Sequence, residues 1–228
     1  MLSMPTILAS LLALSSVAVA IPARRDDDPS SDSNSTSDAY GISGYKTIDI
    51  SWDLPTDLNN ASSPIVTVTG TVQQAVAAME AAYPGWNATF QSKLPPPTAD
   101  DEGDDDDDTA DSKFLSLPER ESFTCDLPYI AASTRRIGDG IKYLRGLSGT
   151  AKNGPGWGNC GRVSCSWSSA IYWCNDNAQE KEVGWNDIAD GAEFLMHSDC
   201  VRRKKTVLGQ VFFKDKWNVI VRHDENNC

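Results

Sequence analysis

The sequence predicts an α+β protein, with a disulfide-stabilised four-stranded antiparallel sheet and two helices on one face, preceded by a small ββα unit and an acidic linker. Two observations predict this class. All six cysteines of the 228-residue chain lie after residue 120. In that half, hydrophobic periodicity follows the order helix, hairpin, helix, hairpin, which is typical of a sheet covered by helices on one face.

The charge of the chain differs between its halves. The formal net charge is −12, but residues 1–112 hold 18 acidic and 4 basic side chains (−14), whereas residues 113–228 hold 14 and 16 (+2). Nucleic-acid binders present basic surfaces, so we expect no nucleic-acid partner. The near-neutral second half is still compatible with another kind of anionic partner.

Residues 1–20 have the pattern of a secretory signal peptide. An apolar run from Ile7 to Ala20 ends in the small-residue sequence Ala18-Val19-Ala20, although Lys and Arg are absent before the run. The alternative, a membrane anchor, needs about 18 or more apolar residues. We therefore expect a secreted, extracellular protein. Arg24-Arg25 is either a dibasic processing site or a pair of solvated charges.

Residues 21–40 are rich in Asp, Ser and Pro, and we expect them to be disordered. Residues 41–93 then predict a ββα unit. Alternation around Ile48, Ile50 and Trp52 indicates a strand, and the β-branched run at residues 65–69 indicates another. Thr71 and Gln74 form a capping box for a helix that ends at Pro84-Gly85. One helical face carries Val72, Ala75, Val76, Met79 and Tyr83. So small a unit either docks on the second half or is a marginal pro-region.

Residues 94–120 predict an extended linker, because three prolines precede a dense block of carboxylates. A calcium site is the alternative, but adjacent carboxylates lack the alternating spacing of a calcium loop. N-glycosylation sequons occur at Asn34, Asn60 and Asn87, all in the cysteine-free half, and are usable in a eukaryotic host.

Residues 121–228 predict the cysteine-rich α+β domain, which at 108 residues is long enough to fold alone. Thr134 can cap a first helix with Ile137, Ile141 and Leu144 on one face. A strand follows in which Val163, Cys165 and Trp167 alternate with polar residues, then a turn at Ser168-Ser169 and a strand to Cys174. A second helix covers about residues 186–197. The last hairpin pairs residues 208–213 with 217–222.

An even number of cysteines in an exported chain predicts three disulfides. The cysteines are Cys125, Cys160, Cys165, Cys174, Cys200 and Cys228. Zinc is the alternative, but the chain has no C-x-x-C pair. Sequence leaves 15 connectivities open. We favour Cys174–Cys200, which would join a strand end to a helix end, together with Cys125–Cys165 and Cys160–Cys228.

No catalytic motif, metal site or cofactor site is evident, so we expect no cofactor. One hydrolytic alternative remains, a ribonuclease using Glu193 and His197, which lie one helical turn apart. The favoured role of His197 is at a helix end, where a cation suits the dipole.

Two features predict binding. Trp157 lies in a Gly-rich loop and is the tryptophan that we expect to be exposed, whereas most of the others belong to the core. The second feature is a basic run whose members are Arg202, Arg203, Lys204 and Lys205. It is either a charged loop or a contact surface for anionic lipid, cell-wall polymer or an acidic partner.

The segments CGRVSCSWSSAIYWCND (Cys160–Asp176), GQVFF and WNVIVR resemble those of small secreted cysteine-rich fungal proteins that are effector-like. The order of elements is also similar to killer-toxin-like fungal effectors. Both resemblances imply an extracellular protein that binds a foreign cell's surface, wall or channel rather than catalysing a reaction. Killer toxins carry further cysteines that this chain lacks, so no toxin mechanism is implied.

We therefore predict a secreted, monomeric, non-enzymatic effector-like or antimicrobial protein. Its expected partner is an unknown target on a host or competitor cell. A secreted hydrolase and a carbohydrate-binding module are the alternatives.

Overall fold

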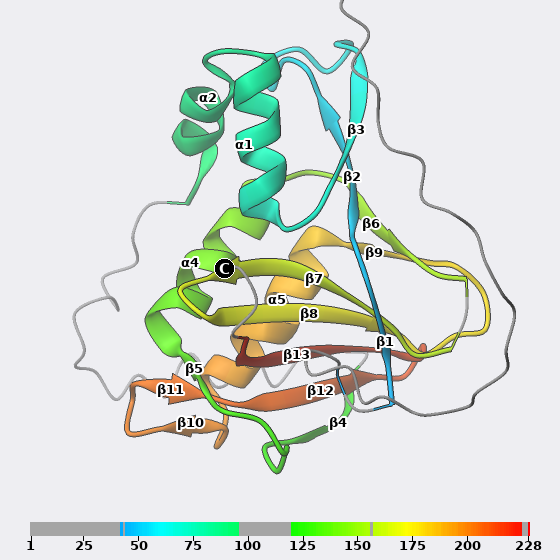
Figure 1. Cartoon of the computed structure of the whole chain (residues 1–228), viewed down its shortest axis with the longest axis vertical. Coiled ribbons are helices and arrows are strands. Elements are labelled where there is room, and N and C mark those ends of the chain that lie inside the picture. Colours follow the sequence, from blue (N-terminus) through cyan, green and yellow to red (C-terminus); the bar gives the residue numbers. More distant parts are fainter. Residues whose placement is uncertain (1–41, 43, 96–119, 156, 225–227) are drawn as a thin grey trace, which may run out of the picture. The chain divides into compact units, whose positions relative to one another are not determined.

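The computed structural model describes residues 42, 44–95, 120–155, 157–224 and 228, all within one compact unit (Figure 1). The signal peptide, the segment 21–40, residues 96–119 of the linker and Asn34 lie outside the described residues. The described part is α+β with four helices. The helices are α1 (Val72–Ala82), α2 (Trp86–Lys93), α4 (Thr134–Arg145) and α5 (Trp185–Met196). The strands are β1 (Lys46–Ile48), β2 (Ser51–Pro55), β3 (Ile65–Thr69), β4 (Arg120–Thr124), β5 (Ala132–Ser133), β6 (Thr150–Asn153), β7 (Asn159–Ser166), β8 (Ser169–Asn175), β9 (Lys181–Gly184), β10 (Val201–Arg202), β11 (Thr206–Val207), β12 (Gly209–Phe213) and β13 (Trp217–His223).

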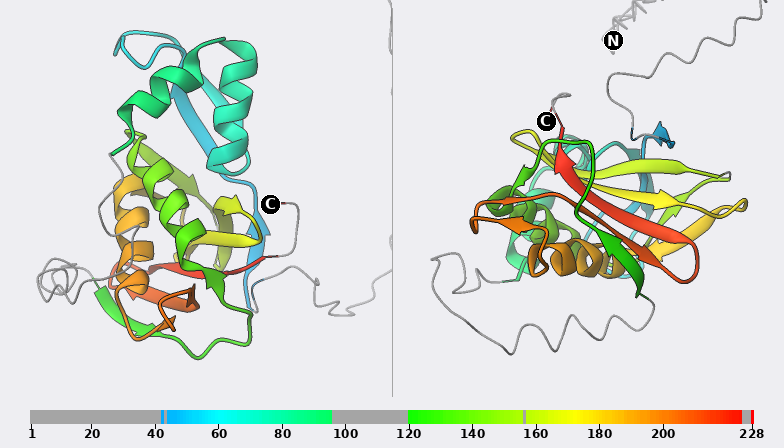
Figure 2. Two further views of the ribbon diagram at one scale, coloured as in Figure 1. Left: turned by 90° about the vertical axis from the view of Figure 1, so that its left-hand side faces the viewer. Right: turned by 90° about the horizontal axis from the view of Figure 1, so that it is seen from below.

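The main sheet has six strands in the order β1-β7-β8-β13-β12-β4, so the prediction of a four-stranded sheet is wrong. The two predicted hairpins, β7–β8 and β12–β13, form its centre. The additional strands lie at the edges, where β1 pairs parallel to β7 and β4 pairs antiparallel to β12. Helices α4 and α5 pack against each other, and both cover the same face of this sheet (Figures 1 and 2).

A register shift in β7 changes which side chains face the helices. The shift lies between Arg162 and Ser164 in the β7–β8 ladder. Val163 therefore packs in the core with the helices, whereas Cys165 packs in a second cluster on the opposite face. The simple alternation of Val163, Cys165 and Trp167 on one face is wrong, because a bulge inserts one residue and reverses the side-chain alternation. The turn lies at Trp167 and Ser168, one residue earlier than predicted.

The first half shares a core with the second. Trp52 on β2 is fully buried and stacks on Trp185 of α5, with ring centroids 3.9 Å apart. Its indole N–H donates to the carbonyl of Gly70 at 2.8 Å. Strand β2 also joins β3, β6 and β9 in a four-stranded sheet. The ββα unit therefore docks on the second half. Its helix α1 has the predicted capping box of Thr71 and Gln74, and α2 is an additional helix.

The chain has the predicted number of disulfides but different pairs. The bonds are Cys125–Cys200, Cys160–Cys174 and Cys165–Cys228, so all three favoured pairs are wrong. Cys160 and Cys174 lie directly opposite each other on β7 and β8. They belong to the cluster on the face away from the helices, out of reach of Cys200, which packs in the helical core.

Candidate functional site

The predicted basic run lies on a short hairpin whose backbone is firmly held. Strands β10 and β11 pair through a three-residue turn made by residues 203–205. The backbone N–H of Thr134, at the start of α4, donates to the carbonyl of Lys205 at 3.1 Å. The hydroxyl of Thr134 donates to the carbonyl of Lys204 at 3.4 Å. Arg202 and all three turn residues are exposed. The hairpin is thus anchored to α4 by its main chain and presents its cationic side chains to solvent.

The first turn of α4 adds two more cations to this region. Arg135 is exposed, and Arg136 is partly exposed and donates to Asp139 at 3.2 Å. The first turn holds no acidic residue, and Ser133 makes no side-chain capping bond. Cations at a helix N-terminus oppose the helix dipole. The helix dipole therefore does not explain why the arginines are there, although Arg136 gains an i,i+3 ion pair with Asp139.

Trp167 lies beside these cations, in the two-residue turn between β7 and β8. Its side chain is 72% exposed, so it is an exception to the expectation that most tryptophans other than Trp157 belong to the core. The guanidinium of Arg136 lies 5.0 Å from its ring centroid, a cation–π contact. Trp167 and Ser168 both have positive φ, at 49° and 56°. A turn of this type favours Asn and Gly, and an L-residue with a bulky side chain is strained in it.

We name these residues together the basic–aromatic surface. Its members are Arg135, Arg136, Trp167, Arg202, Arg203, Lys204 and Lys205. Ile130 lies near its edge and is 64% exposed. The backbone N–H groups of His223 and Asp224, at the end of β13, donate to the carbonyls of Ile130 (2.8 Å) and Ser168 (3.0 Å). The end of β13 therefore holds Ile130 on one side and the Trp167 turn on the other.

Trp157, the predicted binding residue, is 77% exposed, which confirms its predicted exposure. It precedes β7, whereas Trp167 follows it. The eight residues of β7 span about 26 Å at 3.3 Å per residue. The structure therefore does not bring Trp157 to the basic run, and it places Trp167 there instead. The signal that could have identified Trp167 is the shortness of the turn, because a two-residue hairpin turn points its side chains toward solvent.

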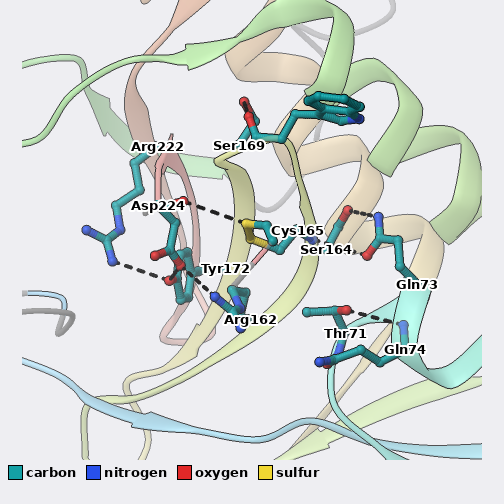
Figure 3. Close-up of a disulfide and its surroundings, with 12 residues drawn as sticks. Thr71, Gln73, Gln74, Arg162, Ser164, Cys165, Ser169, Tyr172, Arg222 and Asp224 are labelled. Atoms are coloured by element: carbon teal, nitrogen blue, oxygen red, sulfur yellow. Dashed lines mark hydrogen bonds and ion pairs between the residues drawn. A yellow bond between two sulfur atoms is a disulfide. The ribbon is translucent and has the colours of Figure 1, made fainter. Parts of the chain in front are cut away.

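A buried ionic network supports this end of the sheet from the face opposite the helices (Figure 3). The carboxylate of Asp224, only 1% exposed, accepts hydrogen bonds from Arg162 Nη1 at 3.0 Å and from the Tyr172 hydroxyl. Arg222 Nη2 donates to the same hydroxyl at 3.3 Å. Burial, together with the hydrogen bond to Asp224, raises the pKa of Tyr172 to about 12. The network fixes Asp224, whose backbone holds the Trp167 turn.

Helix α1 reaches the same end of β7 through one side chain (Figure 3). Gln73 accepts a hydrogen bond from the backbone N–H of Cys165 at 3.1 Å and donates to the hydroxyl of Ser164 at 2.8 Å. The ββα unit therefore helps to fix the strand that leads into the Trp167 turn.

The residues proposed for ribonuclease chemistry have other contacts. The Glu193 carboxylate accepts a hydrogen bond from Arg145, which also donates to Asp190 at 2.6 Å. This cluster joins α4 to α5. His197 ends α5, and its backbone N–H donates to the carbonyl of Glu193 at 3.2 Å.

The two described sequons lie on the ββα unit. Asn60 is exposed in the β2–β3 connection, and Asn87 is partly exposed in the first turn of α2. A pocket of about 230 Å³ lies between these segments. It is smaller than ordinary ligand clefts, which enclose about 300–1,000 Å³.

Within the described ranges, no group of three or more His, Cys, Asp or Glu residues is placed to hold a metal ion. No helix in that part of the chain is long and apolar enough to cross a membrane. Comparisons of the chain with protein-family models, with curated proteins and with solved structures find no match.

Proposed function

We propose that this chain is a secreted, non-enzymatic, effector-like or toxin-like protein that acts by binding a component of a foreign cell's surface. The basic–aromatic surface is the observation that carries the proposal. Six cations and one exposed tryptophan meet there from three separate parts of the chain. Clustered cations attract anionic partners, and an exposed aromatic ring adds apolar contact area.

This arrangement lowers the stability of the fold, and that loss supports a role in binding. The arginines of α4 oppose the helix dipole, and Trp167 occupies a backbone conformation that favours other residues. Backbone strain of this kind tends to occur at functional sites. The three disulfides are typical of extracellular proteins, in agreement with action outside the producing cell.

Binding of the labelled, secreted full chain to intact yeast and plant cells tests the proposal. The test variant is Arg203→Ser/Lys204→Ser/Lys205→Ser, which removes three cations of the surface. The matched control, Lys46→Ser/Lys93→Ser/Lys152→Ser, removes the same charge from exposed positions elsewhere. We expect the parent and the control to bind one of these cells and the test variant to bind at least tenfold less. Equal binding by both variants would contradict the proposal.

A carbohydrate-binding module is a second candidate, favoured by the exposure of Trp157, because an exposed ring can stack on a sugar. Retention on insoluble chitin or glucan tests it. If this candidate is right, Trp157→Ala should abolish retention and Trp167→Ala should preserve it. Failure of the parent chain to be retained would remove the candidate.

A further inference from the structure

The basic–aromatic surface combines cations with apolar side chains that face solvent. Trp167 and Ile130 are 72% and 64% exposed and flank the end of β13. Around them lie the cations of α4 and of the β10–β11 hairpin. Among the residues that the structure describes, Asp139, the partner of Arg136, is the one carboxylate that forms an ion pair with this surface.

We infer that this surface docks on the headgroup region of an anionic lipid bilayer. The inference rests on the proposed function and names its partner. Trp167 and Ile130 enter the interface between headgroups and acyl chains, and the surrounding cations contact lipid phosphates and carboxylates. Tryptophan prefers this interface, because its ring is apolar while its N–H group keeps a polar contact.

The apolar side chains favour a bilayer over the other anionic polymers. Nucleic acids and acidic polysaccharides offer charges and flat faces, which cations and aromatic rings can use. An aliphatic side chain such as Ile130 has no flat face to stack. It gains most from an apolar medium, which acyl chains supply and hydrated polymers do not.

The position of the surface allows such docking. The predicted glycan sites Asn60 and Asn87 lie on the β2–β3 connection and on α2. Figures 1 and 2 show these segments at the end of the described unit away from the β10–β11 hairpin. Glycans at these positions would not cover the basic–aromatic surface.

Co-sedimentation of the secreted full chain with vesicles tests the inference. One set contains phosphatidylcholine alone, and the other contains phosphatidylcholine and phosphatidylserine in equal parts. The salt is set near 0.1 M, where screening over about 10 Å suppresses repulsion from remote acidic residues. We expect binding to the vesicles with phosphatidylserine and at least tenfold weaker binding to phosphatidylcholine alone.

Two pairs of variants locate the contact. Each cation near an anionic bilayer contributes about fivefold in affinity, so Arg203→Ser/Lys204→Ser/Lys205→Ser should bind about a hundredfold more weakly. Lys46→Ser/Lys93→Ser/Lys152→Ser, with the same charge, should bind as the parent does.

The second pair of variants tests the tryptophan. Trp167→Ala should lower the affinity for the vesicles about tenfold, whereas Trp157→Ala should retain parental affinity. Unfolding by urea checks that each variant is folded.

The outcomes separate this inference from the proposed function. No preference for phosphatidylserine, or equal losses in a test variant and its control, would overturn bilayer docking. If the basic–aromatic surface is needed for cell binding and vesicles are not bound, the partner is another surface polyanion. The inference then fails and the proposed function stands. If neither cells nor vesicles bind, both fail.

Discussion

Trp167 and Ser168 both have a positive φ, a backbone conformation that costs conformational energy for any residue other than glycine. Each has a φ near +50° (49° and 56°), where contact between Cβ and the carbonyl costs roughly 1–2 kcal/mol per residue. Asn-Gly is the preferred sequence for such a turn. Here the turn carries a large, exposed ring instead. The stability lost at this turn is consistent with a side chain retained for contact with a partner.

We expect Ser168→Gly to raise the free energy of unfolding by about 1 kcal/mol, because glycine adopts positive φ without strain. The Trp167 side chain is unchanged, so binding to cells should persist. Ser166→Gly is the matched control, since Ser166 ends β7 without positive φ, and glycine there should lower stability by about 0.5–1 kcal/mol. Urea unfolding measures both, and stabilisation by neither or by both would contradict the assignment.

The partly buried Tyr45 and the buried Tyr172 make the stability of the fold depend on pH in the alkaline range. Burial and the carboxylate of Asp176 raise the pKa of Tyr45 to about 12, and burial with Asp224 does the same for Tyr172. The unfolded chain ionises its tyrosines near pH 10, so it loses protons before the native state does. This contribution is therefore complete below pH 10 and is lost as the pH rises to about 12.

Urea unfolding across that range, followed with tyrosinate absorbance, should show a fall in stability between pH 10 and pH 12. The fall should be smaller in Tyr45→Phe/Tyr172→Phe. Tyrosines that all ionise near pH 10 without loss of stability would contradict the raised pKa values of Tyr45 and Tyr172.

At the scale of elements, the β7–β8 hairpin explains why its disulfide could not be derived from the sequence. From its two-residue turn, the ladder pairs Ser166 with Ser169 and Cys165 with Ala170. Continued without interruption, that register would place Cys160 opposite Asn175. The bulge before Ser164 shifts the register by one residue, so that Cys160 meets Cys174. Hydrophobic alternation predicts the strands, but a bulge leaves too weak a signal to locate.

The disulfides differ in the length of chain that each closes. Cys125–Cys200 spans 75 residues and Cys160–Cys174 spans 14. Constraint of the unfolded chain gives about 4.5 kcal/mol for the longer loop and about 3 kcal/mol for the shorter. We therefore expect Cys125→Ala/Cys200→Ala to lose more stability in urea unfolding than Cys160→Ala/Cys174→Ala. Equal losses, or the reverse order, would show that packing outweighs chain entropy here.

At the scale of the whole molecule, the sequence predicts the helices and hairpins of the second half but not the two edge strands of the main sheet, β1 from the first half and β4 from the second. Strand β4 is mostly exposed and lacks a clear apolar period. Strand β1 has three residues, of which Ile48 belongs to the alternation predicted as a single strand with Trp52, whereas the structure places Trp52 in the separate strand β2. Only part of the basic–aromatic surface can be predicted from the sequence. Its basic run is visible as four consecutive cations, whereas Trp167 and the arginines of α4 are brought near that run only by folding.

Trp52 tests whether the two halves depend on each other. Because it is fully buried against Trp185, Trp52→Ala should lower the free energy of unfolding by about 3–5 kcal/mol. Trp157→Ala, at an exposed position, should change it by less than about 0.5 kcal/mol. Urea unfolding of the full chain measures both. A small effect of Trp52→Ala, with residues 121–228 alone as stable as the full chain, would contradict a shared core.

The placement of the disulfides has a consequence for proteolysis. All three bonds lie within residues 125–228, and none reaches the ββα unit. A single cut within residues 96–119 would therefore produce two polypeptides joined only by noncovalent contacts, among them the β1–β7 ladder and the Trp52–Trp185 stack. Such a nicked protein would migrate as one species in native electrophoresis. It would separate in denaturant without any reductant, as a heterodimer made from one gene product.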